Sequence, residues 1–299
     1  MKVKGMLFTI LSALLFGVTP ILASKTYDMG SNPETLTFYR NFLVIPIVCI
    51  IMLVKKTSFK IDLKLLFNMV LVGCMGRGVT TLTLYMAYDY IGVGTATTLH
   101  FLYPVFVALI CFLFYKEHLE WTKILALFIA VAGVSFFIDT GHQAALIGIL
   151  LSVGSALSYA YYIVGLDKKG IKDVDPFKVS FYMAIAVSCG MLIYNIPTQK
   201  INFALPPKAF LYTFIIAVCT SFLAVILLQM GLRHLSSTSA AILCLFEPVS
   251  CTIAGVIFLS EKLTAAKIAG TLLILAAVLI IMLSPQLMKL VKKKKQVEL

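Results

Sequence analysis

The sequence predicts an all-α integral membrane protein with ten transmembrane helices arranged as two inverted five-helix repeats. Three observations lead to this prediction. Hydrophobic residues make up 61% of the 299-residue chain and charged residues only 13%, whereas soluble domains carry about 25% charged residues. Apolar segments of roughly 20 residues, the length that crosses a bilayer, follow one another along the whole chain. The first half of the sequence also recurs in the second half.

The apolar segments are separated by short polar stretches that leave no room for a separate soluble domain. The fifth segment is short. The third and fourth segments are separated only by YDYIGVG, and the eighth and ninth only by RHLSS, so each pair should form a tight antiparallel hairpin. The expected spans are, in order, about 5–24, 34–54, 65–87, 93–115, 121–138, 145–165, 177–196, 208–231, 237–260 and 264–287.

The distribution of basic residues predicts the orientation of these spans. If the N-terminus is cytoplasmic, eighteen lysines and arginines fall on the inner side and five on the outer side, while Arg40 and Arg77 lie inside spans. Cytoplasmic loops carry such an excess of basic residues. We therefore expect a multi-pass protein of the cell membrane with both termini in the cytoplasm, and the short loops favour a bacterial inner membrane.

The internal repeat runs almost without gaps. GMLFTILSALLFG from Gly5 aligns with GILLSVGSALSYA from Gly148 at an offset of 143, and residues 96–124 align with 240–268 at an offset of 144. Because each copy holds five spans, the second copy enters the membrane upside down, which is the architecture of many secondary transporters. The prediction is a first repeat at 1–140, a second at 141–288 and a basic cytoplasmic tail at 289–299.

The fourth and ninth spans carry the most specific signal. Both hold a proline within the apolar run and a glutamate near its end, in YPVFVALICFLFYKEHL and EPVSCTIAGVIFLSEKL. Together with GMLFTILSALLFGVTP at the start, these motifs resemble the EamA branch of the drug/metabolite transporter superfamily over essentially the whole chain. The resemblance implies ten helices, an inverted repeat and transport of small metabolites.

Signatures of enzymes are missing from the sequence. It contains no P-loop, no G-x-S-x-G and no H-E-x-x-H, and GRGVTT lacks the third glycine of a dinucleotide fingerprint. All seven cysteines lie in apolar runs without a C-x-x-C pair. We therefore expect no enzymatic activity, no cofactor and no metal site. The net charge of +12 fits loops that face anionic lipid, and we expect no nucleic-acid partner.

Glu247 is the most unusual residue, because it places a carboxylate before Pro248 in the middle of an apolar run. An ionisable group at that depth costs about 3 kcal/mol unless it is compensated. Pro248 removes a backbone hydrogen bond about one turn earlier and should loosen the helix there. Glu247 either faces a central cavity, where it binds a substrate cation or a coupling proton, or is satisfied by the backbone or an arginine and holds two helices together.

Arg40 and Arg77 are the cationic counterparts of Glu247. An arginine stays charged and offers a planar fork to a carboxylate or phosphate. Either arginine is expected to pair with Glu247 or to bind an anionic group of the substrate. Arg40 lies close to the outer end of its span, so extension of its side chain to the membrane surface is the alternative. The depth of Arg77 leaves no route to water except through the protein.

Several further polar and aromatic side chains are candidates for the cavity wall. His100 lies one turn before Pro104 and is either a hydrogen-bonding cavity residue or a satisfied core histidine. Tyrosines suit aromatic rings or quaternary amines through cation–π contact, and simple packing is the alternative for each. The candidate substrate-binding residues are Glu247, Arg77, Arg40, His100, Tyr85, Tyr103, Gln229 and Tyr159, where Tyr85 and Gln229 are partners across the repeat.

Small residues and helix-end charges have structural interpretations. Gly73, Gly76 and Gly78 should allow close helix packing in the third span. Glu117 and its repeat partner Glu261 should anchor helix ends.

The function predicted from these features is secondary active transport of small polar metabolites, with amino acids or their derivatives favoured, by alternating access around a cavity lined by spans 1, 3, 4, 6, 8 and 9. Transport of quaternary amines or lipophilic cations, by a choline-type importer or a drug exporter, is one alternative. A lipid-carrier flippase or an accessory membrane subunit is an alternative of another class. A small molecule and membrane lipid are the expected partners, with coupling to protons or to exchange.

Overall fold

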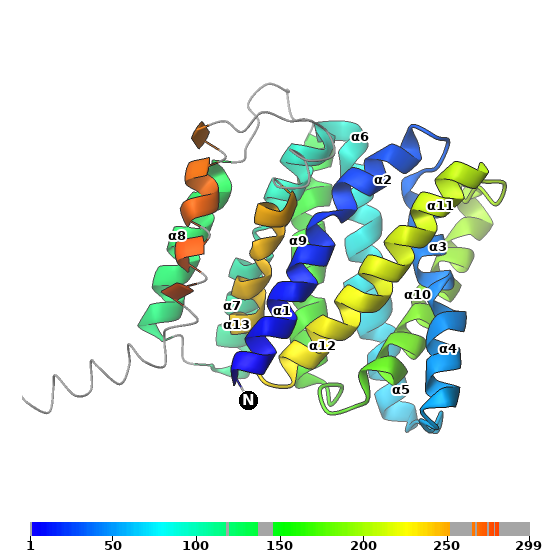
Figure 1. Cartoon of the computed structure of the whole chain (residues 1–299), viewed down its shortest axis with the longest axis horizontal. Coiled ribbons are helices and arrows are strands. Elements are labelled where there is room, and N and C mark those ends of the chain that lie inside the picture. The colour runs from blue at the N-terminus through cyan, green and yellow to red at the C-terminus, as the bar shows by residue number, and fades with distance from the viewer. Residues whose placement is uncertain are drawn as a thin grey trace, which may run out of the picture.

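A computed structural model describes residues 2–117, 120–136, 146–251 and, between 265 and 280, all except 267, 274 and 278. These residues form helices and turns, without a strand among them. The helices stand side by side, with α8 at one edge of the molecule and α4 towards the other (Figure 1). Within the described residues, seven helices are long and apolar enough to cross a membrane: Lys2–Tyr27, Pro33–Val54, Leu63–Gly94, Ala96–Tyr115, Leu146–Lys168, Pro176–Thr198 and Pro207–Leu232.

Three shorter apolar helices coincide with the fifth, ninth and tenth expected spans. They are Trp121–Gly133, Ser237–Cys251 and Ile268–Ala277, the last with gaps in its description. The multi-pass, all-helical class is thus confirmed, while the count of ten membrane-crossing helices stays a prediction. The basic tail at 289–299 and Glu261 lie outside the described residues.

Several of the spans are built from more than one helical segment. In the first half of the chain the segments are α1 (Lys2–Gly17), α2 (Thr19–Tyr27), α3 (Pro33–Phe42), α4 (Val44–Val54), α5 (Leu63–Leu71), the π-helical η1 (Val72–Gly78), α6 (Val79–His100), α7 (Tyr103–Tyr115) and α8 (Trp121–Ser135). In the second half they are α9 (Leu146–Lys168), α10 (Pro176–Thr198), α11 (Pro207–Ile216), the π-helical η2 (Ala217–Ala224), α12 (Val225–Leu232) and α13 (Ser237–Cys244).

Among the described residues, prolines follow short breaks in four of the spans. The helix before Pro248 is broken at Leu245, and the helix before Pro104 is broken at 101–102. Proline supplies no N–H group, and its ring clashes with the carbonyl four residues earlier, so the preceding turn opens. The predicted loosening before Pro248 is therefore confirmed. Two further breaks fall at Val18, between α1 and α2 and two residues before Pro20, and at Leu43, between α3 and α4 and three residues before Pro46.

The hairpin predicted between the third and fourth spans is formed at Gly92. This glycine has φ +73° and ψ +161°, a backbone conformation that is essentially restricted to glycine. The chain turns there within α6 and continues into the fourth span. The hairpin between the eighth and ninth spans is closed by Ser236, which caps α13 by accepting a hydrogen bond from the Ser239 N–H.

Packing between the two halves follows the offset of the sequence repeat. A Cβ on Gly5 would lie 2.7 Å from the Cβ of His234, and a Cβ on Gly148 would lie 2.7 Å from the Cβ of Tyr90. These two contacts are related by the offsets of 143 and 144. Ser12 adds a hydrogen bond between the halves, because its hydroxyl donates to the Ala224 carbonyl at 2.7 Å. Each half therefore contributes one helix that packs on the other half, as α1 does beside α12 (Figure 1).

The two π-helical segments, η1 and η2, are also repeat partners. The wider π turn places η1 against α9 and α10, and the predicted close packing of its glycines is confirmed. A Cβ on Gly76 would come within 2.8 Å of the Tyr162 Cβ, and one on Gly73 within 3.3 Å of the Met183 side chain. Such π turns are frequent at functional sites.

Charged residues at one end of the bundle form the expected helix anchors. Glu117 accepts from Lys168 Nζ at 2.5 Å, which confirms its structural role. Asp167, almost fully buried, pairs with Lys172 Nζ at 2.5 Å and accepts from the Ser237 hydroxyl at 2.8 Å. These contacts tie the end of α9 to the start of α13.

Candidate substrate-binding cavity

A cavity of about 80 Å³ lies where the broken helices meet. A single water needs roughly 10–15 Å³ by this measure, so the space suits several waters or a small metabolite. Interrupted helices near the midplane form the binding sites of many transporters, because they present free backbone and side-chain groups there. The wall is formed by Phe16, Gly17, Thr19, Pro20, Arg40, Thr80, Thr81, Leu84, Tyr85, Tyr88, Thr97, His100, Phe101, Tyr159, Glu247 and Cys251.

Arg40 enters the cavity from α3 and is only 4% exposed. Its Nε donates to the Ser221 hydroxyl at 2.7 Å, its Nη2 donates to the Thr220 hydroxyl at 3.0 Å, and its Nη1 donates to the Tyr85 hydroxyl. These partners are neutral, and within the described part of the chain no carboxylate pairs with Arg40. The alternative that Arg40 reaches the membrane surface is therefore wrong.

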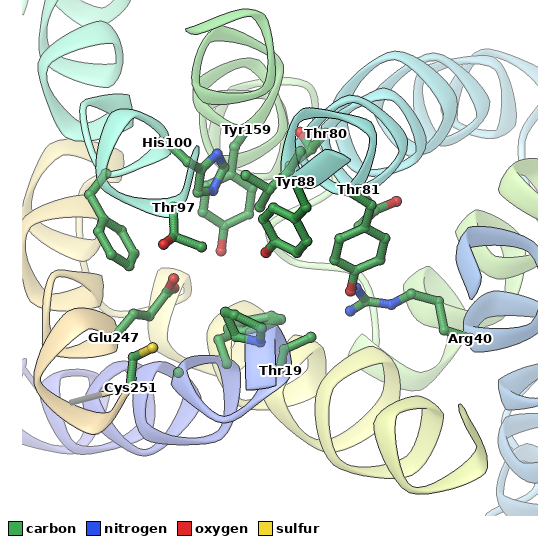
Figure 2. Close-up of a pocket in the computed structure, with 16 residues that line it drawn as sticks. Thr19, Arg40, Thr80, Thr81, Tyr88, Thr97, His100, Tyr159, Glu247 and Cys251 are labelled. Carbon is green, nitrogen blue, oxygen red and sulfur yellow. The ribbon is translucent and has the colours of Figure 1, made fainter. Parts of the chain in front are cut away.

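Glu247 faces the same cavity from the segment after the Leu245 break, and its side chain points inward (Figure 2). It is 7% exposed, and its Oε1 finds no hydrogen-bond donor among the described residues. Gly17 makes this placement possible, because a Cβ there would lie 2.5 Å from the Glu247 carbonyl oxygen. The close approach of α1 fixes the backbone that carries the carboxylate.

Three hydroxyl groups on the wall are buried without a hydrogen-bond partner, as the Glu247 Oε1 is. The hydroxyl oxygens of Thr19, Tyr88 and Tyr159 are buried, and none has a partner within hydrogen-bond distance in the described structure. Buried polar atoms are almost always hydrogen-bonded, because an unmade bond costs about 1–3 kcal/mol. Four such atoms around one cavity indicate that a polar ligand or water completes their hydrogen bonds.

His100 lies at the helix break before Pro104 and links the cavity to α9. Its Nδ1 is 2.9 Å from the Ser155 hydroxyl, which itself donates to the Ser152 carbonyl at 2.6 Å. Because the Ser155 hydroxyl already donates its proton to the Ser152 carbonyl, its oxygen accepts a hydrogen bond from His100. The neutral ring therefore carries its proton on Nδ1 and keeps Nε2 as an acceptor. Its ring also packs against Tyr103 and Tyr159.

Five of the eight predicted residues line the cavity together: Glu247, Arg40, His100, Tyr85 and Tyr159. The other three lie outside its wall. Tyr103 is fully buried behind Tyr159, with ring centroids 4.7 Å apart. Arg77 donates from Nη2 to the Ser221 carbonyl at 2.9 Å, and it does not pair with Glu247. Gln229 borders a separate small cavity.

Sequence reasoning did not single out the threonines on the wall. Thr80 and Thr97 donate to the carbonyls of Gly76 and Val93, at 2.6 Å each, and so cover their own helix backbone. Threonine is too common in membrane helices to be a signal on its own. Five of the six expected spans contribute to the wall. The eighth instead supplies Thr220 and Ser221, which hold the long side chain of Arg40 from the second span.

Comparison with protein families gives a match over nearly the whole chain. A model described as the EamA-like transporter family matches residues 3–138 and 146–283. The two matched stretches correspond to the two halves related by the internal repeat.

Individual proteins give the same picture at low identity. The chain is 24% identical over 284 residues to the uncharacterized transporter YcbK of Bacillus subtilis, covering 89% of this chain and 88% of that protein. It is 24% identical over 207 residues to human solute carrier family 35 member G1, covering 64% of this chain and 55% of that protein. A solved crystal structure matches its fold with a TM-score of 0.78 at 15% identity, covering 94% of this chain and 96% of the other.

Proposed function

The chain belongs to the EamA-like transporter family and is a multi-pass membrane transporter, and we propose that it moves small zwitterionic metabolites, amino acids or their derivatives, by alternating access. The substrate ammonium group binds to Glu247 and its carboxylate to Arg40. Because the sequence holds no P-loop, the driving force is an ion gradient or exchange.

One observation carries this proposal. Glu247 and Arg40 are a buried acidic and a buried basic side chain on one small cavity, and among the described residues neither has an ion-pair partner. The Arg40 fork has five N–H groups, of which three are used. A zwitterion compensates both charges at once and leaves the cavity neutral. His100 Nε2 and the hydroxyls of Tyr88 and Tyr159 supply the remaining hydrogen bonds.

A second candidate substrate is a quaternary amine, and the tyrosines favour it. Tyr85, Tyr88 and Tyr159 present aromatic surface to the cavity beside Glu247, as cation-binding sites do. A cation-only ligand, however, leaves the Arg40 guanidinium uncompensated in the same small space. Because of that repulsion, we rank the quaternary amine below the zwitterion as a candidate substrate.

Uptake into proteoliposomes tests the proposal with three ligands that share one side chain: an amino acid, the amine that lacks its carboxylate, and the N-acetylated acid that lacks its ammonium charge. The expected result is saturable uptake of the amino acid alone. The Glu117→Gln variant, altered in the helix-end ion pair, serves as a control that keeps transport. Saturable uptake of the amine or of choline, without uptake of the amino acid, would contradict a zwitterionic substrate and support a cationic one.

A further inference from the structure

Three polar side chains form a second cluster behind Tyr159: Arg77 of η1, Tyr162 of α9 and Gln229 of α12. All three are buried, and Arg77 is 5% exposed. Arg77 Nη1, the Tyr162 hydroxyl and both polar atoms of the Gln229 amide lack a partner within hydrogen-bond distance among the described residues. The cluster thus contains unsatisfied donors that neither the wall of the main cavity nor the helix anchors explain.

The fold brings these side chains together. Gly76, the residue before Arg77, lets α9 approach closely, because a Cβ on Gly76 would lie 2.8 Å from the Tyr162 Cβ. The Tyr162 hydroxyl lies close to the Arg77 guanidinium and to the Gln229 amide, although the hydroxyl and the amide do not meet in hydrogen-bond geometry. Gln229 in turn borders a cavity of about 10 Å³ that it shares with Leu232, with Leu166 near the end of α9 and with Lys172 in the loop that follows α9.

The repeat relates this cluster to the main cavity. At offsets of 143 and 144, Tyr162 corresponds to Thr19, Gln229 to Tyr85 and Leu232 to Tyr88. Thr19, Tyr85 and Tyr88 all line the main cavity. Two of the equivalent positions, Gln229 and Leu232, border the small cavity of about 10 Å³, so the repeat places a nearly closed space where the other half has a larger one. In a transporter that alternates between two states, the closed side becomes the open one.

We propose that Arg77, Tyr162 and Gln229 form a second anion-binding site, which accepts the carboxylate of the substrate when it leaves Arg40. Arg77 Nη1, the Tyr162 hydroxyl and Gln229 Nε2 are three donors for one carboxylate, and charge-assisted bonds of this kind are the strong ones. Ser221 connects the two sites, because its hydroxyl holds Arg40 and its carbonyl holds Arg77. The identity of the anion rests on the proposed function, whereas the binding of an anion does not.

Binding of sodium formate to the purified full-length protein in detergent, at constant ionic strength, tests this site. Formate is the smallest carboxylate and carries no other polar group. Wild-type protein is expected to show two saturable phases in its thermal stabilisation. Arg77→Met is expected to remove one phase and Arg40→Met the other. Gln229→Leu, which keeps the volume of the side chain, is expected to weaken the Arg77 phase about tenfold or more, since it removes a bond to a charged group.

Arg233→Met is the matched control. Arg233 is exposed at a helix end, where it donates to backbone carbonyls such as that of Val174, and its replacement should leave both phases intact. Two phases retained in Arg77→Met and unchanged in Gln229→Leu would overturn the second site. So would a single wild-type phase that only Arg40→Met removes. If Arg77→Met does not fold, the test of the second site rests on whether Gln229→Leu weakens one of the two formate phases.

The outcome also separates this site from the transport proposal. Two formate phases without uptake of any amino acid into proteoliposomes would support the second anion site and contradict the proposal of a zwitterionic substrate. Uptake of the amino acid, together with a formate response that Arg77→Met and Gln229→Leu leave unchanged, would support the zwitterionic substrate and contradict the second anion site.

Discussion

Glu247 and Arg40 face one cavity from opposite walls and do not pair with each other (Figure 2). An acidic and a basic side chain attract each other strongly in apolar surroundings, because the local dielectric constant is low. Here Arg40 is held away from Glu247 by Ser221, Thr220 and Tyr85. The arrangement keeps both charges available to a ligand that lies between them.

Glu247→Gln is expected to raise the KM for the transported zwitterion at least tenfold. The amide keeps the shape of the carboxylate but loses the charge that binds the ammonium group, and a hydrogen bond to a charged group contributes roughly 1.5–3 kcal/mol. Initial rates of uptake into proteoliposomes measure the change. An unchanged KM would return Glu247 to a structural role.

Arg40→Lys is expected to weaken binding of the zwitterion about tenfold while binding of its carboxylate-free amine changes little. Lysine keeps the charge but loses the planar fork that matches a carboxylate. Competition by each compound against the labelled amino acid measures the difference. Equal losses for both compounds would mean that the substitution damages the cavity as a whole.

Gly17→Ala is expected to lower the free energy of unfolding by about 1–3 kcal/mol, the usual cost of overpacking. A Cβ there would lie 2.5 Å from the Glu247 carbonyl oxygen, so the helix that carries Glu247 has to move. Gly154→Ala in α9, where a Cβ meets no atom within 4 Å, is the matched control. Denaturant titration in detergent micelles measures both, and equal stabilities would contradict the close packing.

Gly92→Ala is expected to destabilise the protein by about 1–3 kcal/mol through backbone strain alone. The positive φ of +73° at this turn excludes side chains. Gly94→Ala, two residues further on and with open space around its Cβ, should be neutral or slightly stabilising. If the two variants unfold at the same denaturant concentration, the turn does not require glycine.

The sequence predicts the helix positions well because hydrophobicity and the repeat act over many residues at once. The breaks before Pro104 and Pro248 and the turn at Gly92 follow from the chemistry of single residues. The π-helical segments were not predicted, because widening of a helix turn depends on tertiary contacts such as that between Gly76 and Tyr162.

Part of the site could also be predicted from the chemistry of single residues. Charged residues in apolar runs are costly, so Glu247 and Arg40 stand out in the sequence. Which of two arginines reaches the cavity depends on the hydroxyls of Thr220 and Ser221, which are distant in the chain. Arg77 is drawn instead to the Ser221 carbonyl, and a single sequence contains no signal for that choice.

The most direct test of the central claim is the thermal stability of purified protein in detergent with an amino acid, its carboxylate-free amine and its N-acetylated form, for wild type, Glu247→Gln and Arg40→Lys. We predict that the amino acid stabilises the wild type most. The Glu247 variant should lose the response to the amino acid and the amine, and the Arg40 variant the response to the amino acid and the N-acetylated acid. Stabilisation by the amino acid that is equal in all three proteins would contradict a site between Glu247 and Arg40.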